Sequence, residues 1–120
     1  MSTKEVAENY IAAIHNGGWE SYLAEDMVFV SNNLDRVHYG RRAYSEAAGR
    51  FFNSTTGCEI RQLVTEGDKA ALIVRYFVKS PKGALGGLDV AEFLRIQDNK
   101  LVSSTIFFDN EEFGEFMRGD

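Results

Sequence analysis

The sequence predicts one α+β domain over residues 1–120, with helices packed on one face of a curved antiparallel β-sheet. Its first half contains two segments in which apolar residues recur at helical spacing. Its second half contains successive strand-like segments without helices between them. The chain of 120 residues, 44% of them hydrophobic and nine of them phenylalanine, is long enough to bury a core. These observations favour a single domain.

The first predicted helix begins after Ser2 and runs to about Asn16. Ser2 and Glu5 have the spacing of a capping box, in which each side chain accepts a hydrogen bond from the backbone N–H of the other residue. The glycine pair at 17–18 ends this helix, because glycine readily adopts the backbone conformation found after a helix.

Residues 19–24 are expected to form a short amphipathic helical turn, and residues 27–31 the first strand. A polar loop at 32–40 leads into a second helix at 41–52, which the polar segment 53–57 ends. The inward face of this helix consists of Tyr44, Ala47, Ala48 and Phe51.

The second half is predicted to contain two hairpins. Strands at 58–65 and 69–78 are joined by a turn at 66–68, and a connection with three glycines at 81–87 leads to a longer hairpin at 88–109. The strand at 69–78 places its apolar residues on one side, with Arg75 on the other: Leu72, Val74, Tyr76 and Val78. Asp109 and Glu112 have the spacing of a helix cap, which predicts a last helical turn carrying Phe113, Phe116 and Met117.

The turn of the long hairpin, within residues 97–100, decides which side chains of the last strand face the core. The preceding strand has one face made of Leu88, Val90, Glu92, Leu94 and Ile96. A two-residue loop would place Leu101, Ser103, Thr105 and Phe107 beside that face, and a three-residue loop Val102, Ser104, Ile106 and Phe108. We expect the three-residue loop, because its face is more apolar and Asn99 tolerates the left-handed conformation that it needs. Glu92 then lies opposite Ser104.

Composition excludes several classes of function. A formal charge of −5 argues against a nucleic-acid or anionic-membrane surface, since either needs a basic patch. No apolar segment approaches the length of a membrane span, and the N-terminus lacks the layout of a signal peptide, so we expect a cytoplasmic protein. The single cysteine, Cys58, excludes an internal disulfide, while His15 and His38 lie on different elements and no phosphate-binding loop is present. We therefore expect neither a metal nor a cofactor.

Several segments resemble the cone-shaped nuclear-transport-factor-2-like superfamily, and most closely its SnoaL-like and ketosteroid-isomerase-like group. They are Tyr-Ile-Ala-Ala-Ile-His-Asn-Gly-Gly-Trp at 10–19, Leu-Ala-Glu-Asp-Met-Val-Phe-Val at 23–30, Ala-Glu-Phe-Leu-Arg-Ile-Gln-Asp-Asn-Lys-Leu at 91–101 and Phe-Phe-Asp at 107–109. Gly40 before the second helix also fits. The resemblance implies an apolar pocket between the helices and the concave sheet face, and often a dimer through the outer face. It implies no single reaction, because this fold carries isomerases, cyclases, hydrolases and binding modules.

The resemblance to ketosteroid isomerases assigns roles to two residues and fails at a third. Tyr10 falls at the position of the tyrosine that donates a hydrogen bond to the developing enolate. Glu92 falls at the position of a protonated carboxylic acid that donates the second bond, where the reference residue is the shorter Asp. Ser31 stands at the position of the general-base aspartate, and a serine cannot remove a proton from carbon at neutral pH without a partner base.

The residues themselves also single out Glu92 and Tyr10. Burial between Val90 and Leu94 would disfavour the charged form of Glu92 and raise its pKa, which would make it a proton donor near neutral pH. The alternative is a position at the open mouth of the pocket, or an ion pair with an arginine. Tyr10 lies on the apolar face of the first helix, where its hydroxyl either reaches the pocket or bonds to the backbone.

The polar loop after the first strand supplies the candidates for the missing base. Asp35 or His38 could act if the loop folds over the pocket, although both could equally be solvated loop residues. Further candidate substrate-binding residues are those expected to line the pocket, although the aromatic ones among them could equally belong to the core: Trp19, Ser31, Asn32, Phe51, Tyr76, Ser104 and Phe108.

The other face of the long hairpin carries Asp89, Ala91, Phe93 and Arg95 beside Leu101, Ser103, Thr105 and Phe107. This surface is half apolar, and its aromatic side chains would be costly to leave in water. We therefore predict that the outer sheet face is buried in a homodimer.

Together these features predict a small enzyme that binds a hydrophobic or cyclic organic ligand and moves a proton next to a carbonyl, as in isomerisation or polyketide-type ring closure. The alternative is a non-catalytic ligand-binding or protein-assembly module, which Ser31 at the base position favours. Hydrolysis of an epoxide or ester is a third possibility, and it would need a second acid near Glu92.

Overall fold

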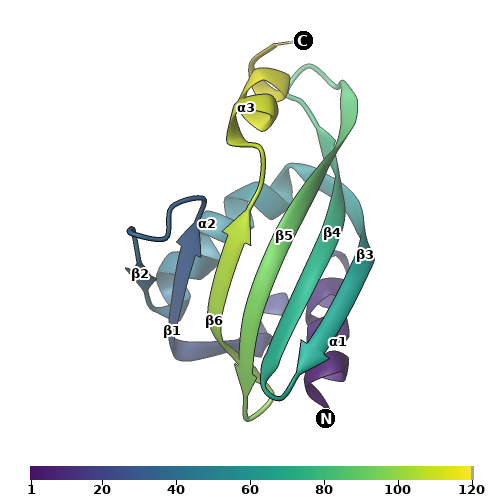
Figure 1. The fold of residues 1–120 in the computed structure, drawn as a ribbon. Helices are drawn as coiled ribbons and strands as arrows, with labels where there is room; N and C mark the ends of the chain where they lie inside the picture. The colour runs from purple at the N-terminus through teal and green to yellow at the C-terminus, as the bar shows by residue number, and fades with distance from the viewer. Residues whose placement is uncertain (120) are drawn as a thin grey trace.

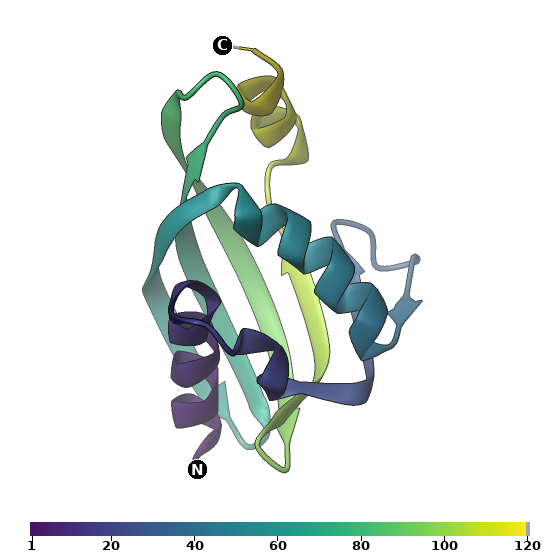
Figure 2. The ribbon, with the colours of Figure 1, turned by 180° about the vertical axis from the view of Figure 1, so that it is seen from behind.

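A six-stranded sheet, in the order β2-β1-β6-β5-β4-β3, organises the computed structural model, which describes residues 1–119 (Figure 1). The helices α1 and α2 cover one face of this curved sheet, while α3 lies beyond the end of β6 (Figure 2). The α+β class agrees with the sequence prediction. Among the described residues, no helix is long and apolar enough to cross a membrane. The elements are α1 (Thr3–Asn16), the 3-10 helix η1 (Trp19–Tyr22), β1 (Leu23–Ser31), β2 (His38–Tyr39), α2 (Arg41–Asn53), β3 (Thr55–Glu66), β4 (Lys69–Lys79), β5 (Leu85–Gln97), β6 (Lys100–Phe107) and α3 (Asn110–Gly119).

The predicted capping box begins α1. The Ser2 Oγ atom accepts a hydrogen bond from the Glu5 backbone N–H at 3.1 Å, and Glu5 Oε1 accepts one from the Ser2 N–H at 3.0 Å. Gly17, with a φ of 99°, follows the last turn, and its N–H donates to the Ala13 carbonyl. The side chains that α1 buries share one stripe of the helix: Val6, Ala7, Tyr10, Ile11 and Ile14.

Three strands begin earlier than the sequence predicts. The strand β1 begins at Leu23 instead of residue 27, β3 at Thr55 within the predicted stop segment, and β5 at Leu85 within the predicted glycine-rich connection. In each case hydrogen bonding to a neighbouring strand extends the regular structure beyond the local sequence signal. For the same reason the loop at 32–40 contains the short strand β2, which pairs with β1.

The sheet is mixed, so the prediction of an antiparallel sheet is wrong for one pair of strands. The strand β1 runs parallel to β6, with Phe29 beside Ser104 and Val30 beside Thr105, whereas all other neighbouring strands are antiparallel. A tight hairpin imposes an antiparallel pair, but β1 and β6 are separated by most of the chain and no hairpin fixes their relative direction.

The β5–β6 turn has two residues, so the expected three-residue loop is wrong. Asp98 and Asn99 both have positive φ, at 52° and 62°, and Gln97 pairs with Lys100. The register then shifts because Val102 is an extra, unpaired residue in β6, a β-bulge. The bulge returns Ser104 and Ile106 to the predicted inner face. It also leaves Leu101, which was expected to point outward, fully buried beside Ile96.

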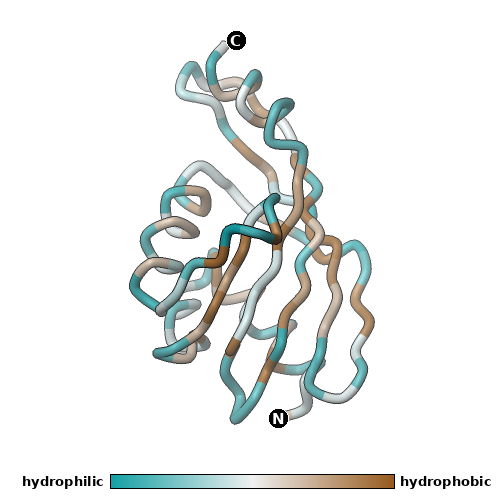
Figure 3. Tube along the Cα trace, turned by 60° about the vertical axis from the view of Figure 1, so that its left-hand side comes forward, coloured by the Kyte–Doolittle hydropathy of each residue, from teal (hydrophilic) through white to brown (hydrophobic). Residues whose placement is uncertain are grey.

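The core lies between the inner sheet face and the helices. Apolar residues are concentrated in the strands and polar residues in the turns (Figure 3). The predicted inner face of β4 is buried in full, and it meets the inner faces of β5 and β6 and the buried sides of α1 and α2: Leu72, Val74, Tyr76 and Val78 with Leu88, Val90, Leu94, Ile96 and Leu101.

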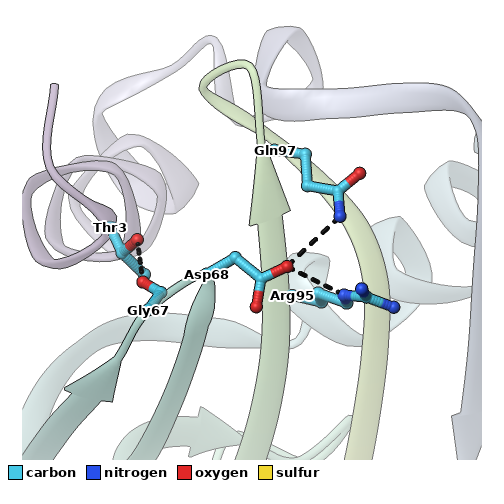
Figure 4. Close-up of polar contacts among 5 residues, drawn as sticks. All are labelled: Thr3, Gly67, Asp68, Arg95 and Gln97. Atoms are coloured by element: carbon cyan, nitrogen blue, oxygen red, sulfur yellow. Dashed lines mark hydrogen bonds and ion pairs between the residues drawn. The ribbon is translucent and has the colours of Figure 1, made fainter.

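Polar contacts tie together the end of the sheet where β3 turns into β4 (Figure 4). The Thr3 hydroxyl at the start of α1 donates to the Gly67 carbonyl at 2.7 Å. Asp68 Oδ2 accepts hydrogen bonds from Arg95 Nε at 2.9 Å and from Gln97 Nε2 at 3.2 Å, both on β5. These bonds hold the pKa of Asp68 below its ordinary value. The turn therefore links α1, β4 and β5.

The last helix begins with the predicted cap, because Asp109 Oδ1 accepts a hydrogen bond from the Glu112 N–H at 2.8 Å. Its apolar side packs against the start of β5, where β4 connects to β5. Phe116 lies so close to Gly86 of β5 that a Cβ atom there would stand 2.9 Å from the ring, so a larger residue at this position would force the ring to shift. α3 thereby lies next to the C-terminal end of α2, where Phe113 contacts Phe51.

We expect the chain to sediment as a dimer and Phe93→Glu to sediment as a monomer. The outer face of the sheet exposes large apolar side chains, Ile73, Phe77 and Phe93, the last with half of its surface in water (50%). A buried glutamate at the centre of that face would lose hydration without a partner. Analytical ultracentrifugation measures the outcome.

The matched control is Leu34→Glu, because Leu34 is also a large exposed apolar residue (65%) but lies in the loop after β1. This variant should sediment as the unaltered chain does. Unchanged sedimentation of Phe93→Glu would contradict the dimer prediction.

Candidate functional site

A cavity of about 350 Å³ lies between α2, the inner faces of β4, β5 and β6, and α3. Most of its wall is apolar or aromatic. Within residues 1–119, Glu92 is its one carboxylate and Arg50 its one cation. The lining residues are Phe29, Ser31, Tyr44, Ala47, Ala48, Arg50, Phe51, Phe52, Ser54, Tyr76, Val90, Glu92, Ile106, Phe108, Asn110, Phe113 and Met117.

Glu92 lies on the inner face of β5 with only 2% of its surface exposed. It pairs across the sheet with Leu72 and Ile106; the expected partner, Ser104, lies opposite Leu94 instead. The Tyr76 hydroxyl donates a 2.7 Å hydrogen bond to Glu92 Oε2. Burial raises the pKa of Glu92 to about 7, and the bond from Tyr76 offsets part of this rise. The carboxyl group is therefore poised to exchange a proton near neutral pH.

Tyr44 is the second polar group of the inner wall, and sequence reasoning placed it only among core or stacking residues. It projects from the first turns of α2, and its hydroxyl is hydrogen-bonded to that of Tyr10 at 2.8 Å. Burial raises the pKa of Tyr44 to about 12 and that of Tyr10 well above its ordinary value. Both hydroxyls thus stay protonated and can act as hydrogen-bond donors.

Tyr10 itself is fully buried and does not line the cavity. Its ring lies behind Tyr44 and edge-on to Tyr22, with ring centroids 6.4 Å apart. Tyr10 is therefore connected to the cavity wall only by its hydrogen bond to Tyr44, whereas Tyr76 is hydrogen-bonded to Glu92 itself. Four protonatable groups, three phenols and one carboxyl, form a buried cluster at this wall.

Aromatic rings form the sides of the cavity. Phe51 of α2 lies 5.1 Å from Tyr76, 6.3 Å from Phe108 and 5.5 Å from Phe113, measured between ring centroids. The ring of Phe51 is stacked with that of Phe108 and lies edge-on to the other two. Flat apolar groups fit between such walls, because aromatic rings favour stacked and edge-on contacts with one another.

Some of the remaining predicted site residues line the cavity and others do not. Ser31 lines the cavity at the end of β1, as do Phe51, Tyr76 and Phe108. Trp19 packs against Phe52 and Tyr44 behind the wall and does not line the cavity. Asn32, with a φ of 60°, accepts a hydrogen bond from the Phe108 N–H at 2.8 Å, which joins the end of β1 to the end of β6.

Ser104 is almost fully buried, and its hydroxyl has no hydrogen-bond partner among the described residues. It stands on β6 between Phe29 of β1 and Leu94 of β5, outside the cavity lining. It is nevertheless close enough to Tyr44 to oppose part of the rise in the pKa of that residue.

The two residues proposed as a substitute base, Asp35 and His38, are exposed on the segment after β1 and do not line the cavity. The imidazole of His38 stacks on Phe29 with a centroid separation of 5.0 Å, and Phe29 separates it from the interior. A proton-transfer role for either residue stays a prediction.

Twelve of the lining residues were not predicted as site residues, and they include Tyr44, Arg50, Asn110, Phe113 and Met117. The sequence did indicate an apolar helix after Asp109, but not that this helix packs over the end of α2. Nothing in the sequence marked Arg50 as a site residue, because basic residues are common in the last turn of a helix.

Neither a cluster of metal ligands nor an ionised thiol is found among the described residues. Among residues 1–119, no three His, Cys, Asp or Glu side chains are grouped so as to hold a metal ion. Cys58 is half-buried on β3, and burial raises the pKa of its thiol to about 11, so it stays protonated at neutral pH.

Comparison with known proteins agrees with this architecture. The profile of the SnoaL-like domain family matches residues 7–104. No curated protein sequence matches the chain significantly.

Solved structures with a similar fold include a proposed SnoaL-like polyketide cyclase from Jannaschia sp. CCS1, with a TM-score of 0.81, 10% identity and coverage of 98% of this chain and 93% of that one. The epoxide hydrolase/cyclase-like enzyme SalBIII, which acts in pyran ring formation in salinomycin, has a TM-score of 0.79, 15% identity and coverage of 91% and 92%. A proposed ketosteroid isomerase from Kribbella flavida has a TM-score of 0.68, 22% identity and coverage of 90% and 78%. At these identities the likeness concerns the fold.

The buried carboxyl group should make stability depend on pH. The pKa of Glu92 is raised in the folded protein, so the folded state binds more protons than the unfolded state between pH 4.5 and about 7. Its contribution is fully present below pH 4.5 and is lost as pH rises through about 7. The difference between the two pKa values corresponds to about 3 kcal/mol.

Urea unfolding of the unaltered chain and of Glu92→Gln from pH 4 to pH 8.5 measures this effect. Relative to the variant, the unaltered chain should lose stability over that range. Parallel stability curves would contradict the elevated pKa.

Proposed function

The chain belongs to the SnoaL-like domain family, and from this premise we propose that it is an enzyme that transfers a proton next to the carbonyl of a flat, mainly apolar cyclic ligand. The observation that supports this most is Glu92, a carboxyl group with a pKa of about 7 in the wall of an aromatic cavity. A proton-transfer group is most effective when its pKa is close to the working pH.

In the proposed step, the Glu92 carboxylate removes a proton from the carbon next to the carbonyl. The C–H electron pair forms the C=C bond of an enolate, and the negative charge moves to the carbonyl oxygen. Where a C=C bond is conjugated with the enolate, return of the same proton from Glu92 to the far carbon of that dienolate completes an isomerisation. Alternatively, the enolate carbon attacks a second carbonyl and closes a ring, and the alkoxide that forms takes the proton from Glu92. Glu92 is thus assigned the role of base and acid in place of the hydrogen-bond donor implied by the resemblance.

The three tyrosines of the buried cluster have two different roles in this proposal. If Tyr10 donates to Tyr44, the Tyr44 proton is free to bond to the enolate oxygen. Tyr76 already donates to Glu92 and orients its carboxyl group. Tyr44 is therefore the proposed oxyanion donor, and Tyr10 and Tyr76 are positioning residues.

The proposal gives no step to Asp35 or His38, whose side chains lie outside the cavity lining. It is in keeping with the fold relatives, among which SalBIII is described as an epoxide hydrolase/cyclase-like enzyme. A non-catalytic ligand-binding module is the second candidate, and Ser31 at the cavity wall, a residue without basic character, favours it.

We expect the protein to exchange the acidic protons of 2-tetralone with deuterium from the solvent, measured by NMR. Glu92→Gln should lower the enzymatic rate by about 100-fold or more, because glutamine cannot accept the proton. The rate of the unaltered enzyme should rise with pH and level off above about 7, as Glu92 becomes ionised.

The matched control is Glu46→Gln, an exposed glutamate on α2 that is paired with Arg42. It should leave the rate unchanged. Binding of 2-naphthol, the aromatic counterpart of the tetralone enol, without any exchange would contradict catalysis and favour the ligand-binding module.

We also expect Tyr44→Phe to weaken 2-naphthol binding by about tenfold, because a hydrogen bond to a partly charged oxygen is lost. Tyr10→Phe should have a smaller effect, since Tyr10 acts only through Tyr44. Titration of naphthol fluorescence measures both. A larger loss in Tyr10→Phe than in Tyr44→Phe would reverse the two roles.

A further inference from the structure

The cavity opens into a shallow surface groove with a different character. The two spaces share Arg50, Ser54 and Met117. Beyond these shared residues, the groove is lined by polar residues of α2, β3 and the end of β4: Asn53, Thr55, Thr56, Lys79, Ser80 and Pro81. A molecule seated in the apolar cavity and extending outward would pass along this groove.

The groove is positively charged. Arg50 stands on the last turn of α2, four residues before Ser54, and the Lys79 backbone N–H donates to the Ser54 carbonyl at 2.9 Å. Arg50 lines both the cavity and the groove, whereas Lys79 lines the groove alone. No carboxylate lines the groove, and within residues 1–119 neither cation lies within 4.0 Å of one.

The hydroxyl groups of Ser54, Thr55 and Ser80 in the groove already have partners within the chain. The Thr55 hydroxyl donates to the Phe52 carbonyl and contacts His15, the Ser54 hydroxyl donates to the Phe51 carbonyl, and the Ser80 hydroxyl accepts from the Ala84 N–H. The two cations and the amide of Asn53 are thus the groups left to recognise a ligand. The dipole of α2 favours a cation at Arg50 but does not explain Lys79, which lies on a strand.

We propose that the cavity mouth is a carboxylate-binding subsite, at which Arg50 and Lys79 hold an acidic substituent of the cyclic ligand. This inference rests on the proposed function and narrows its substrate class: a flat ring system with an enolisable oxygen at the Glu92 end and a carboxylate at the opposite end. An arginine can bind a carboxylate through two parallel hydrogen bonds, and the lysine adds a second positive charge.

The test compares three probes that differ at one end: 2-naphthol, 6-hydroxy-2-naphthoate and the methyl ester of that acid. The acid and its ester have nearly the same shape, so the ratio of their dissociation constants isolates the charge. We expect the unaltered protein to bind the acid about threefold to tenfold more tightly than the ester. Because the chain has a net charge of −5, which repels anions, such a preference must arise locally.

Arg50→Gln and Lys79→Gln should each reduce the preference for the acid over the ester, and the double variant should abolish it. High salt should also reduce the preference, because both cations are at the surface. Arg42→Gln, an exposed arginine on the same helix that is paired with Glu46, is the matched control and should preserve the preference.

The outcomes separate the subsite from the proposed function. Equal binding of acid and ester by the unaltered protein, or a preference that survives in the double variant, overturns the subsite; if 2-tetralone exchange still depends on Glu92, the proposed function stands. Failure of all three probes to bind contradicts both. Loss of the preference in the double variant, together with its retention in Arg42→Gln, supports the subsite.

Discussion

The pairing of β4 with β5 along the whole length of β4 is the constraint on which the site depends. It places Tyr76 of β4 and Glu92 of β5 on the same face of the sheet. On that face only the Val74–Val90 pair lies between them. These small side chains leave room for the phenol ring of Tyr76 to lean along the sheet, so that its hydroxyl reaches the Glu92 carboxyl at 2.7 Å. The helices then cover this face and remove the carboxyl group from water.

Burying a carboxyl group is costly unless it is neutral or paired, and this protein surrounds Glu92 with neutral donors. Tyr76 contacts it, and Tyr44 and Tyr10 lie in the same buried cluster. A buried arginine would have stabilised the ionised form and lowered the pKa. Hydroxyl groups alone leave the two protonation states close in free energy, with a pKa of about 7. The positive charge of the lining lies at the mouth, on the exposed Arg50.

Sequence patterns predicted the features that depend on local chemistry: the capping box at Ser2, the second helix and the inner face of β4. They left the burial of Glu92 as one of two alternatives. They failed where distant segments decide the outcome. The parallel pairing of β1 with β6, the early start of β3 and the packing of α3 over the cavity depend on tertiary contacts. The hairpin turn shows both effects, because either loop length was compatible with the sequence and the bulge at Val102 reconciled a two-residue turn with the inner face.

The placement of Glu92 has a stereochemical consequence. It stands on the sheet side of the cavity, on β5, while α2 covers the opposite side. A flat ring held between these layers would present one face to the carboxyl group. A proton that leaves and returns through Glu92 would therefore depart from and arrive at the same face of the ring. The handedness of any new stereocentre would then be set by which way up the ligand enters, and hence by whatever anchors its outer end.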